Sequence, residues 1–221
     1  MFWKNDPWWK KKITYWDNPP ISQFEWEKVH QYFLDMIPQQ SIGYPRCLDV
    51  GTGSGLVTKR IKEKGYEVIG IECDARAITL ASAKGLKVLK IDVEKDKFPF
   101  ENQYFDVITC FEVIEHLREP SNMLTEVHRI LKNDGCFIIS TPNVSWWYLR
   151  LKLLLGIWSF HDPDHIRFFT PRSLKECLNF FGFKVVKINS FFNFPRITFL
   201  RLPCFHSISY GFTFLSVKIL N

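Results

Sequence analysis

Between Arg46 and Ser140 the chain alternates short apolar runs with amphipathic segments, and this alternation limits the possible folds more than any other feature. Strands that alternate with helices form right-handed crossovers, which build a mainly parallel sheet with helices on both faces. We therefore predict an α/β, doubly wound fold. The expected strands are 47–50, 67–71, 86–91, 105–110 and 136–140, and the expected helices are 56–64, 75–84 and 120–131.

The segments on either side of this core have other patterns. Residues 1–20 contain four tryptophans without any period and predict an irregular arm. A capping box of Ser22 and Glu25 then predicts a helix that ends at Pro38. We expect residues 1–45 to precede a single domain that spans residues 46–221.

The C-terminal third begins with a second irregular region. Residues 144–160 are rich in Trp and Leu and predict a helix inserted over one edge of the domain, within a cap at about 144–170. A capped helix from Thr170 to Phe181 and two strands over 183–190 and 212–220 complete the expected elements.

A glycine-rich turn joins the first expected strand to the first expected helix, in the run Leu48-Asp49-Val50-Gly51-Thr52-Gly53-Ser54-Gly55-Leu56. Glycines at this position let the backbone approach a ligand closely. The dinucleotide fingerprint requires a glycine where this chain has Leu56, and no Gly-Lys-Ser/Thr follows, so the turn fits neither NAD or FAD nor a phosphate-binding P-loop.

Acidic residues end the next two expected strands. Glu72 lies 21 residues after Gly51, at the distance where an acid accepts hydrogen bonds from ribose hydroxyls. Asp92 ends the third strand, where a carboxylate can accept a hydrogen bond from an adenine amino group. Glycine turn, Glu72 and Asp92 at three successive strand ends predict a nucleoside site.

With these motifs, the chain from about Arg46 to Leu220 resembles the class I S-adenosylmethionine (SAM)-dependent methyltransferases. Further matches are Phe105-Asp106-Val107-Ile108, Glu112-Val113-Ile114-Glu115-His116-Leu117 and the run from Leu131 to Ser140. The ubiquinone-biosynthesis O-methyltransferases, in the type 11 group, are similar. The resemblance implies a Rossmann-like seven-stranded sheet with an antiparallel last strand, an N-terminal lid helix and SAM as cofactor. The cofactor-binding positions it implies are Asp49, Gly51, Thr52, Gly53, Gly55, Glu72, Cys73, Asp92, Val93 and Phe111.

His116 is the expected catalytic residue, because it follows the fourth strand and an imidazole accepts a hydroxyl proton near neutral pH. An alternative is a divalent ion. If residues 112–116 are helical, Glu112, Glu115 and His116 share one face, and His165 can provide a fourth ligand. Similar arrangements occur in enzymes that methylate the 2′-hydroxyl of small RNAs, while related sugar and lipid methyltransferases need no metal that we can infer. We therefore favour a site without metal.

The charges and aromatic residues bear on the acceptor. Residues 47–143 carry 13 basic and 15 acidic side chains, whereas residues 144–221 carry 10 and 3. We expect O-methylation of a small-molecule, sugar or lipid-linked acceptor, with nitrogen or carbon less favoured. The basic third and the set of Glu and His residues at 112, 115, 116 and 165 keep metal-dependent RNA 2′-O-methylation as an alternative. The basic residues form no run, however, so we do not expect a nucleic-acid partner. A non-catalytic SAM-binding or scaffold protein is the alternative of another class.

Cysteine usage and the N-terminus bear on location. Six single cysteines without a metal or disulfide spacing predict buried free thiols in a reducing compartment, and Met1 to Pro7 shows no secretory signal. We therefore expect a cytoplasmic protein. Trp146 and Trp147 beside Arg150 and Lys152 resemble an interfacial helix, which leaves open peripheral contact with a membrane. No pattern specifies an oligomeric state.

Overall fold

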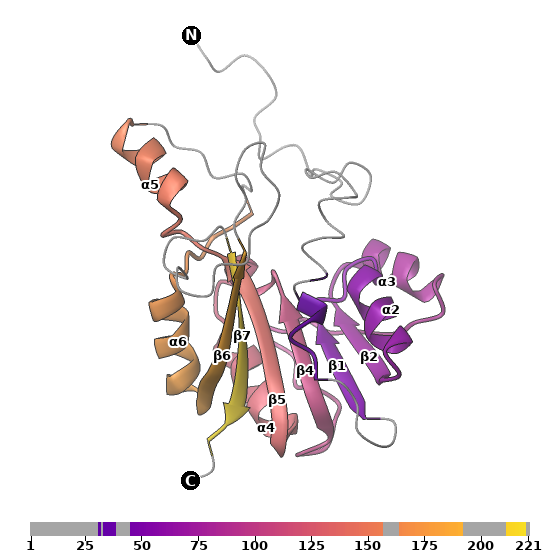
Figure 1. Ribbon diagram of the computed structural model, residues 1–221. Helices are drawn as coiled ribbons and strands as arrows, with labels where there is room; N and C mark the ends of the chain where they lie inside the picture. The colour runs from indigo at the N-terminus through magenta and orange to yellow at the C-terminus, as the bar shows by residue number, and fades with distance from the viewer. Residues whose placement is uncertain (1–30, 32, 39–44, 157–163, 192–210, 220–221) are drawn as a thin grey trace.

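The computed structural model describes residues 31, 33–38, 45–156, 164–191 and 211–219, and the sheet and its helices lie within these ranges (Figure 1). The strands are β1 (Arg46–Val50), β2 (Glu67–Glu72), β3 (Lys87–Lys90), β4 (Phe105–Phe111), β5 (Leu131–Pro142), β6 (Phe183–Phe191) and β7 (Gly211–Lys218). The helices are α2 (Leu56–Glu63), α3 (Ala75–Ser82), α4 (Ser121–Ile130), α5 (Trp147–Leu154) and α6 (Pro171–Phe180), with a 3₁₀ turn η1 (Ile114–His116).

The described strands form one sheet in the order β3-β2-β1-β4-β5-β7-β6. The pairings among β1 to β5 are parallel, and β7 runs antiparallel to both of its neighbours, β5 and β6. The predicted doubly wound sheet with an antiparallel last strand is therefore confirmed. The strand order reverses direction between β1 and β4, and in such sheets a ligand binds at the carboxyl ends of the strands beside this point.

The central strands are covered on both faces. In β1, Cys47, Leu48 and Val50 are each 0% exposed, so apolar side chains are buried on both faces of the strand, and Asp49 between them is buried as well. Part of the predicted N-terminal helix lies outside the described residues, but its end is described. Leu34 packs in one of the two core clusters, and the Pro38 carbonyl accepts a hydrogen bond from the Tyr66 hydroxyl at 2.8 Å.

Residues 133–135, which separate the expected helix 120–131 from the expected strand 136–140, lie inside β5 as an irregularity. Pairing with β4 jumps from Phe105↔Leu131 to Val107↔Cys136. A Cβ on Gly135 would lie 2.8 Å from Leu131 Cδ1 and 2.9 Å from the Asp106 carbonyl oxygen, so a side chain does not fit. The turn residues therefore do not separate α4 from the strand, and β5 begins directly after the helix.

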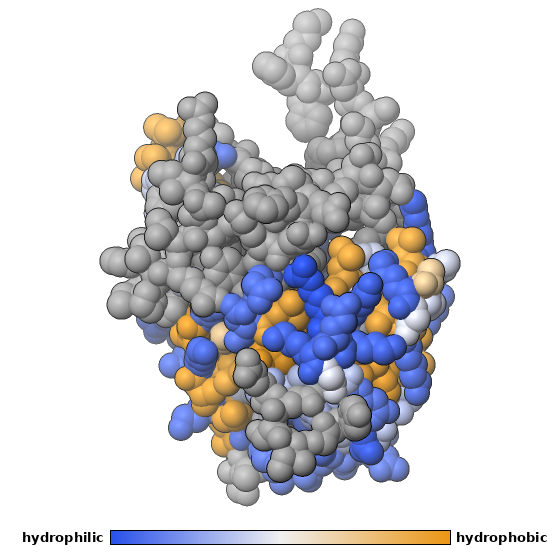
Figure 2. Space-filling view, turned by 45° about the vertical axis from the view of Figure 1, so that its right-hand side comes forward, coloured by the Kyte–Doolittle hydropathy of each residue, from blue (hydrophilic) through white to orange (hydrophobic). Residues whose placement is uncertain are grey.

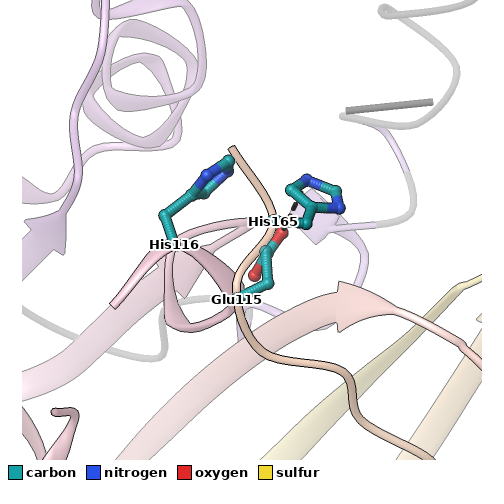
Figure 3. Close-up of side chains that lie close together, drawn as sticks. All are labelled: Glu115, His116 and His165. Carbon is teal, nitrogen blue, oxygen red and sulfur yellow. Dashed lines mark ion pairs between the residues drawn. The ribbon is translucent and has the colours of Figure 1, made fainter. Parts of the chain in front are cut away.

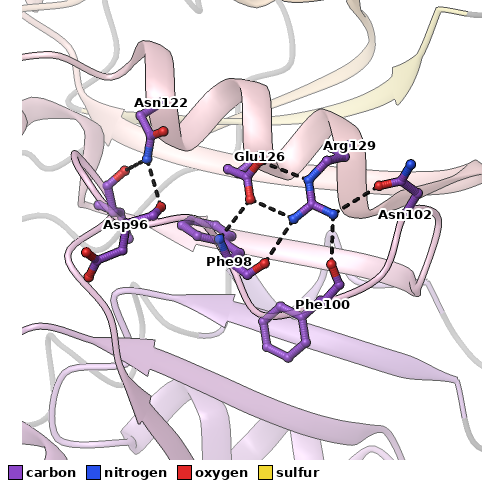
Figure 4. Close-up of polar contacts among 8 residues, drawn as sticks. Asp96, Phe98, Phe100, Asn102, Asn122, Glu126 and Arg129 are labelled. Carbon is purple, nitrogen blue, oxygen red and sulfur yellow. Dashed lines mark hydrogen bonds and ion pairs between the residues drawn. The ribbon is translucent and has the colours of Figure 1, made fainter.

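A polar network fixes the loop that leads from β3 to β4 (Figure 4). The Arg129 guanidinium of α4 donates to the Glu126 carboxylate and to the carbonyl oxygens of Phe98 and Phe100, at 2.6–2.9 Å. The Asn122 amide donates to the carbonyl oxygens of Val93 and Asp96. These bonds hold the backbone that carries Asp92 against α4.

Residues 144–168 form an excursion from the sheet whose two ends lie side by side next to the end of β5. Asn143 pairs with Phe169 in an isolated bridge, and the Val144 N–H donates to the Phe169 carbonyl oxygen at 3.0 Å. We call residues 144–168 the insert. Its helix α5 projects beyond the carboxyl edge of the sheet (Figure 1). The described part of the chain contains no helix with the length and apolar character needed to cross a membrane.

Candidate functional site

The glycine turn after β1 has a backbone that side chains rarely tolerate. Gly51, Gly53 and Gly55 have φ angles of +74°, +54° and +82°. A Cβ on Gly51 would lie 2.3 Å from Val113 Cγ2, and one on Gly55 would lie 2.5 Å from Leu86 Cδ1. The turn therefore requires glycine, and at Gly51 it lies directly against the segment that follows β4.

Asp49 supports this turn from below. It is 3% exposed, and its carboxylate accepts hydrogen bonds from the hydroxyls of Thr58 at 2.5 Å and Thr109 at 2.7 Å. The Thr52 hydroxyl donates to the Asp49 carbonyl oxygen at 3.1 Å. Burial raises the pKa of Asp49 to about 6. These contacts tie β1 to α2 and β4, so in this structure the carboxylate oxygens of Asp49 face protein hydroxyls.

Glu72 joins the ends of β1 and β2. One carboxylate oxygen accepts the Gly53 N–H at 2.9 Å, and the other accepts the N–H groups of Cys73 at 2.8 Å and Asp74 at 3.1 Å. A carboxylate has about four lone-pair sites, so this arrangement leaves capacity for a ligand hydroxyl. Glu72 is therefore held beside the glycine turn by backbone donors.

The thiol next to Glu72 departs from the sequence prediction. Cys73 is exposed, which corrects the expectation that all six cysteines are buried, whereas Cys47, Cys110 and Cys136 are buried as expected. Cys204 lies outside the described residues. Cys73 is exposed because it follows the last residue of β2, at the open edge of the sheet.

Asp92 follows β3 at the same edge. Its carboxylate accepts hydrogen bonds from the Lys95 ammonium at 2.6 Å and from the Glu94 N–H at 3.1 Å. The hydrogen bond from Lys95 lowers the pKa of Asp92. The next residue, Val93, packs partly buried against the main core. The glycine turn after β1, Glu72 at the end of β2 and Asp92 after β3 thus lie at the carboxyl ends of three neighbouring strands.

The segment after β4 is not the single helix that would place Glu112 on one face with Glu115 and His116. Glu112 has a φ of +55°, which is strained for a residue with a side chain, and only the 3₁₀ turn η1 follows. Its carboxylate instead accepts the Ser140 hydroxyl of β5 at 2.6 Å. Phe111, at the end of β4, stacks on Phe33 with a centroid distance of 4.6 Å.

Three of the four predicted metal ligands do come together: Glu115, His116 and His165, with one ligand atom of each within 4.8 Å of the others (Figure 3). Glu115 is 1% exposed, and Oε2 accepts the Thr141 hydroxyl at 3.0 Å. Oε1 has no hydrogen-bond partner among the described residues and lies 4.0 Å from His165 Nε2. Glu112 is absent from the group because the strained backbone turns it toward β5.

Backbone hydrogen bonds hold the insert against this group. The Glu115 carbonyl oxygen accepts the N–H groups of Ile166 and Arg167, both at 2.9 Å. His116 Nδ1 lies 3.1 Å from the Asp164 carbonyl oxygen, and the rings of His116 and His165 meet edge to face at 4.7 Å. Thr141 and the Asp164 carbonyl were given no role from sequence. Thr141 could have been identified from its position near the end of β5, the strand that pairs with β4.

Burial controls the protonation of this group. It lowers the pKa of His116, and burial together with His116 lowers the pKa of His165 to about 4, so both rings are neutral at neutral pH. Burial raises the pKa of Glu112, and burial with the nearby Glu112 raises that of Glu115 well above its usual range. A neutral imidazole can accept a proton or bind a cation, which an imidazolium cannot.

Sheet order, glycine turn and strand-end acids together define the Rossmann-like fold of SAM-dependent methyltransferases. A family model described as a methyltransferase domain matches residues 22–188. The chain therefore belongs to the class I SAM-dependent methyltransferases, enzymes that use S-adenosyl-L-methionine as methyl donor.

Two relatives and two solved structures illustrate the similarity. A ubiquinone biosynthesis O-methyltransferase of Dechloromonas aromatica is 34% identical over 72% of this chain and 73% of its own length. Another from Idiomarina loihiensis is 27% identical over 79% and 76%. A SAM-dependent methyltransferase from Archaeoglobus fulgidus superposes with a TM-score of 0.66 at 24% identity, over 87% of this chain and 94% of its own. A possible histamine N-methyltransferase from Thermotoga maritima superposes with a TM-score of 0.64 at 20% identity, over 88% and 93%. The structural likenesses show the fold alone.

Proposed function

We propose that this methyltransferase transfers the methyl group to an oxygen of a small or lipid-linked apolar acceptor, with His116 as the base. The observation that carries the proposal is the contact between the glycine turn and the segment after β4. Val113 lies against Gly51 of the glycine turn, and His116 follows Val113 by only three positions in the chain. The imidazole of His116, which burial keeps neutral, is therefore attached to the segment that contacts this turn. The relatives named for ubiquinone biosynthesis support oxygen as the methylated atom.

The cofactor lies, in this proposal, along the carboxyl edge of β1, β2 and β3. The glycine turn provides the close backbone approach, Glu72 and Cys73 bind the ribose, and Asp92 and Val93 bind the adenine. Phe111 and Thr52 line the remainder, with Asp49 beneath them. Glu72 fits a nucleoside, because backbone donors hold its carboxylate at this edge of the sheet and leave capacity for a ribose hydroxyl. When bound, SAM supplies an electrophilic methyl group on a sulfonium.

Glu72→Gln tests the ribose contact. Hydrogen bonds to a charged acceptor contribute about 1.5–3 kcal/mol each, so loss of the charge should weaken SAM affinity at least tenfold in calorimetry. The matched control is Glu67→Gln at the other end of β2, where the carboxylate is 63% exposed and pairs only loosely with Arg46 at 3.8 Å. Equal affinities of the two variants, with unchanged melting temperatures, would refute the ribose role.

The hydrogen bond of His116 specifies its tautomer. A carbonyl oxygen only accepts, so the contact with the Asp164 oxygen requires a proton on Nδ1. Nε2 then carries the free lone pair that takes the acceptor proton. His116→Ala should lower kcat roughly 100- to 10,000-fold and leave SAM affinity unchanged. Activity that is restored with acceptors of lower hydroxyl pKa would identify a base; a loss that is equal for all acceptors would contradict it.

A metal-assisted reaction is the second candidate, and one observation favours it. The buried Glu115 Oε1 has no hydrogen-bond partner among the described residues and faces His165 and His116. A divalent ion bound by these three residues would satisfy this oxygen, orient acceptor oxygens and lower a hydroxyl pKa. Turnover that is lost with a chelator and restored by Mg²⁺, Mn²⁺ or Zn²⁺ supports the ion, as does calorimetric binding that Glu115→Gln abolishes. Unchanged turnover and no binding would eliminate it.

The acceptor class is tested with a panel. Labelled methyl transfer to hydroxyl, amine and carbon-acid acceptors, each with a short and a long apolar chain, should be fastest for a hydroxyl on an apolar acceptor. A short RNA serves as the comparison, because the basic C-terminal third and the group of Glu115, His116 and His165 favour it. Methylation of the RNA, or binding that falls steeply with salt, would replace the small acceptor in the proposal.

A further inference from the structure

We propose that Arg167 is a positioning residue for the reaction. Its guanidinium fixes the last part of the insert on η1, so that the Asp164 carbonyl oxygen is held at His116. We call residues 164–168 the return part of the insert. The role rests on the proposed function, in which His116 takes the acceptor proton, and it adds the residue that sets the orientation of this imidazole.

The turn η1 by itself provides little to orient His116. It is a single 3₁₀ turn, in which the His116 N–H donates to the Val113 carbonyl oxygen at 3.0 Å and the Leu117 N–H donates to the Ile114 carbonyl oxygen at 3.4 Å. Hydrogen bonds in 3₁₀ turns have poorer geometry than those of an α-helix. The position of the imidazole therefore depends on contacts from outside the turn.

The two parts of the insert differ in how they meet the domain. The outgoing part, residues 144–156, projects from it: Leu154 and Leu155 are 84% and 67% exposed, and the apolar side chains of α5 form part of the orange group at the upper left of Figure 2. The return part lies against η1, where the Glu115 carbonyl oxygen accepts two backbone N–H groups from it. The return part is thus the attachment of the insert beside the reacting group.

Side chains of the return part alternate between two sides. Ile166 and Phe168 are exposed, whereas His165 and Arg167 between them are partly buried. His165 faces Glu115, as Figure 3 shows. Arg167 lies on the same side of the chain as His165 and so reaches the segment that carries Glu115.

The Arg167 guanidinium binds the carbonyl oxygens that follow η1. Its Nε donates to the Leu117 carbonyl oxygen at 3.0 Å and to the Arg118 carbonyl oxygen at 3.1 Å, and its Nη2 donates to the Arg118 oxygen as well. The backbone N–H of Arg167 donates to the Glu115 carbonyl oxygen at 2.9 Å. One residue therefore contacts the chain on both sides of His116.

The chemistry of these contacts requires an arginine. A guanidinium presents its N–H donors in a rigid planar fork and holds two carbonyl oxygens in one geometry, whereas an ammonium is a point donor on a flexible stem. Asp164 lies only three positions before Arg167. The guanidinium therefore sets the place of the Asp164 carbonyl oxygen, which is 3.1 Å from His116 Nδ1.

The Asp164 oxygen determines which nitrogen of His116 is free. Because a carbonyl oxygen only accepts, this contact keeps the ring proton on Nδ1 and leaves the lone pair on Nε2. Without Arg167 the carbonyl is no longer held, and the ring exchanges between both tautomers. The same carbonyl would orient the ring if His116 bound a divalent ion through Nε2, so the role holds for either candidate reaction.

Nitrogen NMR of protein with isotope-labelled histidine tests the role without any acceptor. Wild type should show the His116 proton on Nδ1, with the signal assigned by its loss in His116→Ala. Arg167→Ala should show the proton shared between Nδ1 and Nε2, and Arg167→Lys should be intermediate because it keeps one donor. The control is Arg172→Ala on α6, where the arginine side chain is 88% exposed and pairs with Glu176, and it should match wild type.

Turnover provides the second readout, with the hydroxyl acceptor that the panel selects. Arg167→Ala should lower kcat about 100-fold, the cost of a small misplacement of a reacting group, and leave KM and the calorimetric affinity for SAM unchanged. Arg167→Lys should recover part of the loss. Because Arg167→Lys keeps the charge and most of the side chain, it provides the test if Arg167→Ala does not fold.

Three results would overturn the proposal: an Nδ1 proton that persists in Arg167→Ala, wild-type values of tautomer and kcat in Arg167→Lys, or an equal change in Arg172→Ala. Each of them leaves His116 as the base. A His116 proton on Nε2 in wild type, or unchanged kcat in His116→Ala, would instead refute the proposed function. The two failures are therefore distinguishable.

Discussion

Replacement of Gly51 by alanine tests the close approach between the glycine turn and the segment after β4. Two costs add. The φ of +74° costs an L residue about 1–2 kcal/mol, and the contact of 2.3 Å with Val113 Cγ2 adds about 1–3 kcal/mol of overpacking. The Gly51 N–H also donates to the Ile71 carbonyl oxygen at 2.9 Å, which limits relaxation of the backbone. Gly51→Ala should therefore lose about 2–5 kcal/mol of unfolding free energy.

Gly85 provides the matched control. Its φ is +72°, but a Cβ there would meet no heavy atom within 4 Å. Gly85→Ala should therefore lose only the strain, about 1–2 kcal/mol. In a protein of this size, 1 kcal/mol changes the melting temperature by about 2–4 °C, so thermal unfolding without SAM resolves the two variants.

A second substitution isolates the contact. Val113→Ala removes Cγ2, so Gly51→Ala in that background should cost no more than Gly85→Ala does. SAM affinity should fall with Gly51→Ala and recover in part in the double variant. Equal losses for the two glycine variants, or no rescue by Val113→Ala, would show that the turn does not depend on the space beside Val113.

Three further predictions concern groups that support the site. The pKa of Asp49, about 6 when folded against 3.8 when unfolded, means that the native state binds the extra proton, so its contribution to stability falls by about 3 kcal/mol as the pH rises from 4 to 7. Asp49→Asn should remove this fall in urea unfolding at several pH values; an identical pH slope would contradict the assignment. Arg129→Lys should destabilise by about 1–3 kcal/mol, because a lysine cannot reach all the oxygens that the guanidinium contacts, whereas Arg172→Lys in an exposed pair should change little. Thr170→Ala should cost about 1 kcal/mol through loss of the capping box with Ser173, and Thr170→Ser should not.

The parallel sheet was predictable because each of its strands is a local signal. β1 and β2 consist mainly of apolar residues, with Asp49 inside β1, and the glycine turn and Glu72 lie where these two strands end. The predicted strand boundaries were wrong where strand pairing overrides the local preference of the sequence for a turn. The residues Asn133 to Gly135 have the composition of a turn, yet β5 contains them because β4 pairs on both sides of the irregularity.

Sequence predicted those site residues whose position follows from the end of a strand, and it did not predict the others. Periodicity suggested one helical face for Glu112, Glu115 and His116, but Glu112 takes a left-handed backbone that no spacing reveals. The approach of His165 depends on hydrogen bonds between Glu115 and residues some fifty positions later, so only the folded chain establishes it. The pairing of Asp92 with Lys95 is local, yet charge pattern alone does not distinguish it from solvated surface.

The bridge between Asn143 and Phe169 brings the two ends of the insert together, so the insert can be replaced as a unit. Because its two ends lie side by side on the sheet, a segment of different length and chemistry can replace it without a change in strand register. Exchange would replace the residues that the insert places beside Glu115 and His116, while the glycine turn and the ends of β2 and β3 stay unchanged. His165 would leave with the insert, whereas Glu115 and His116 would remain, so a grafted insert must bring its own partner for them. The group of Glu115, His116 and His165 is thus shared between two segments, the turn after β4 and the insert.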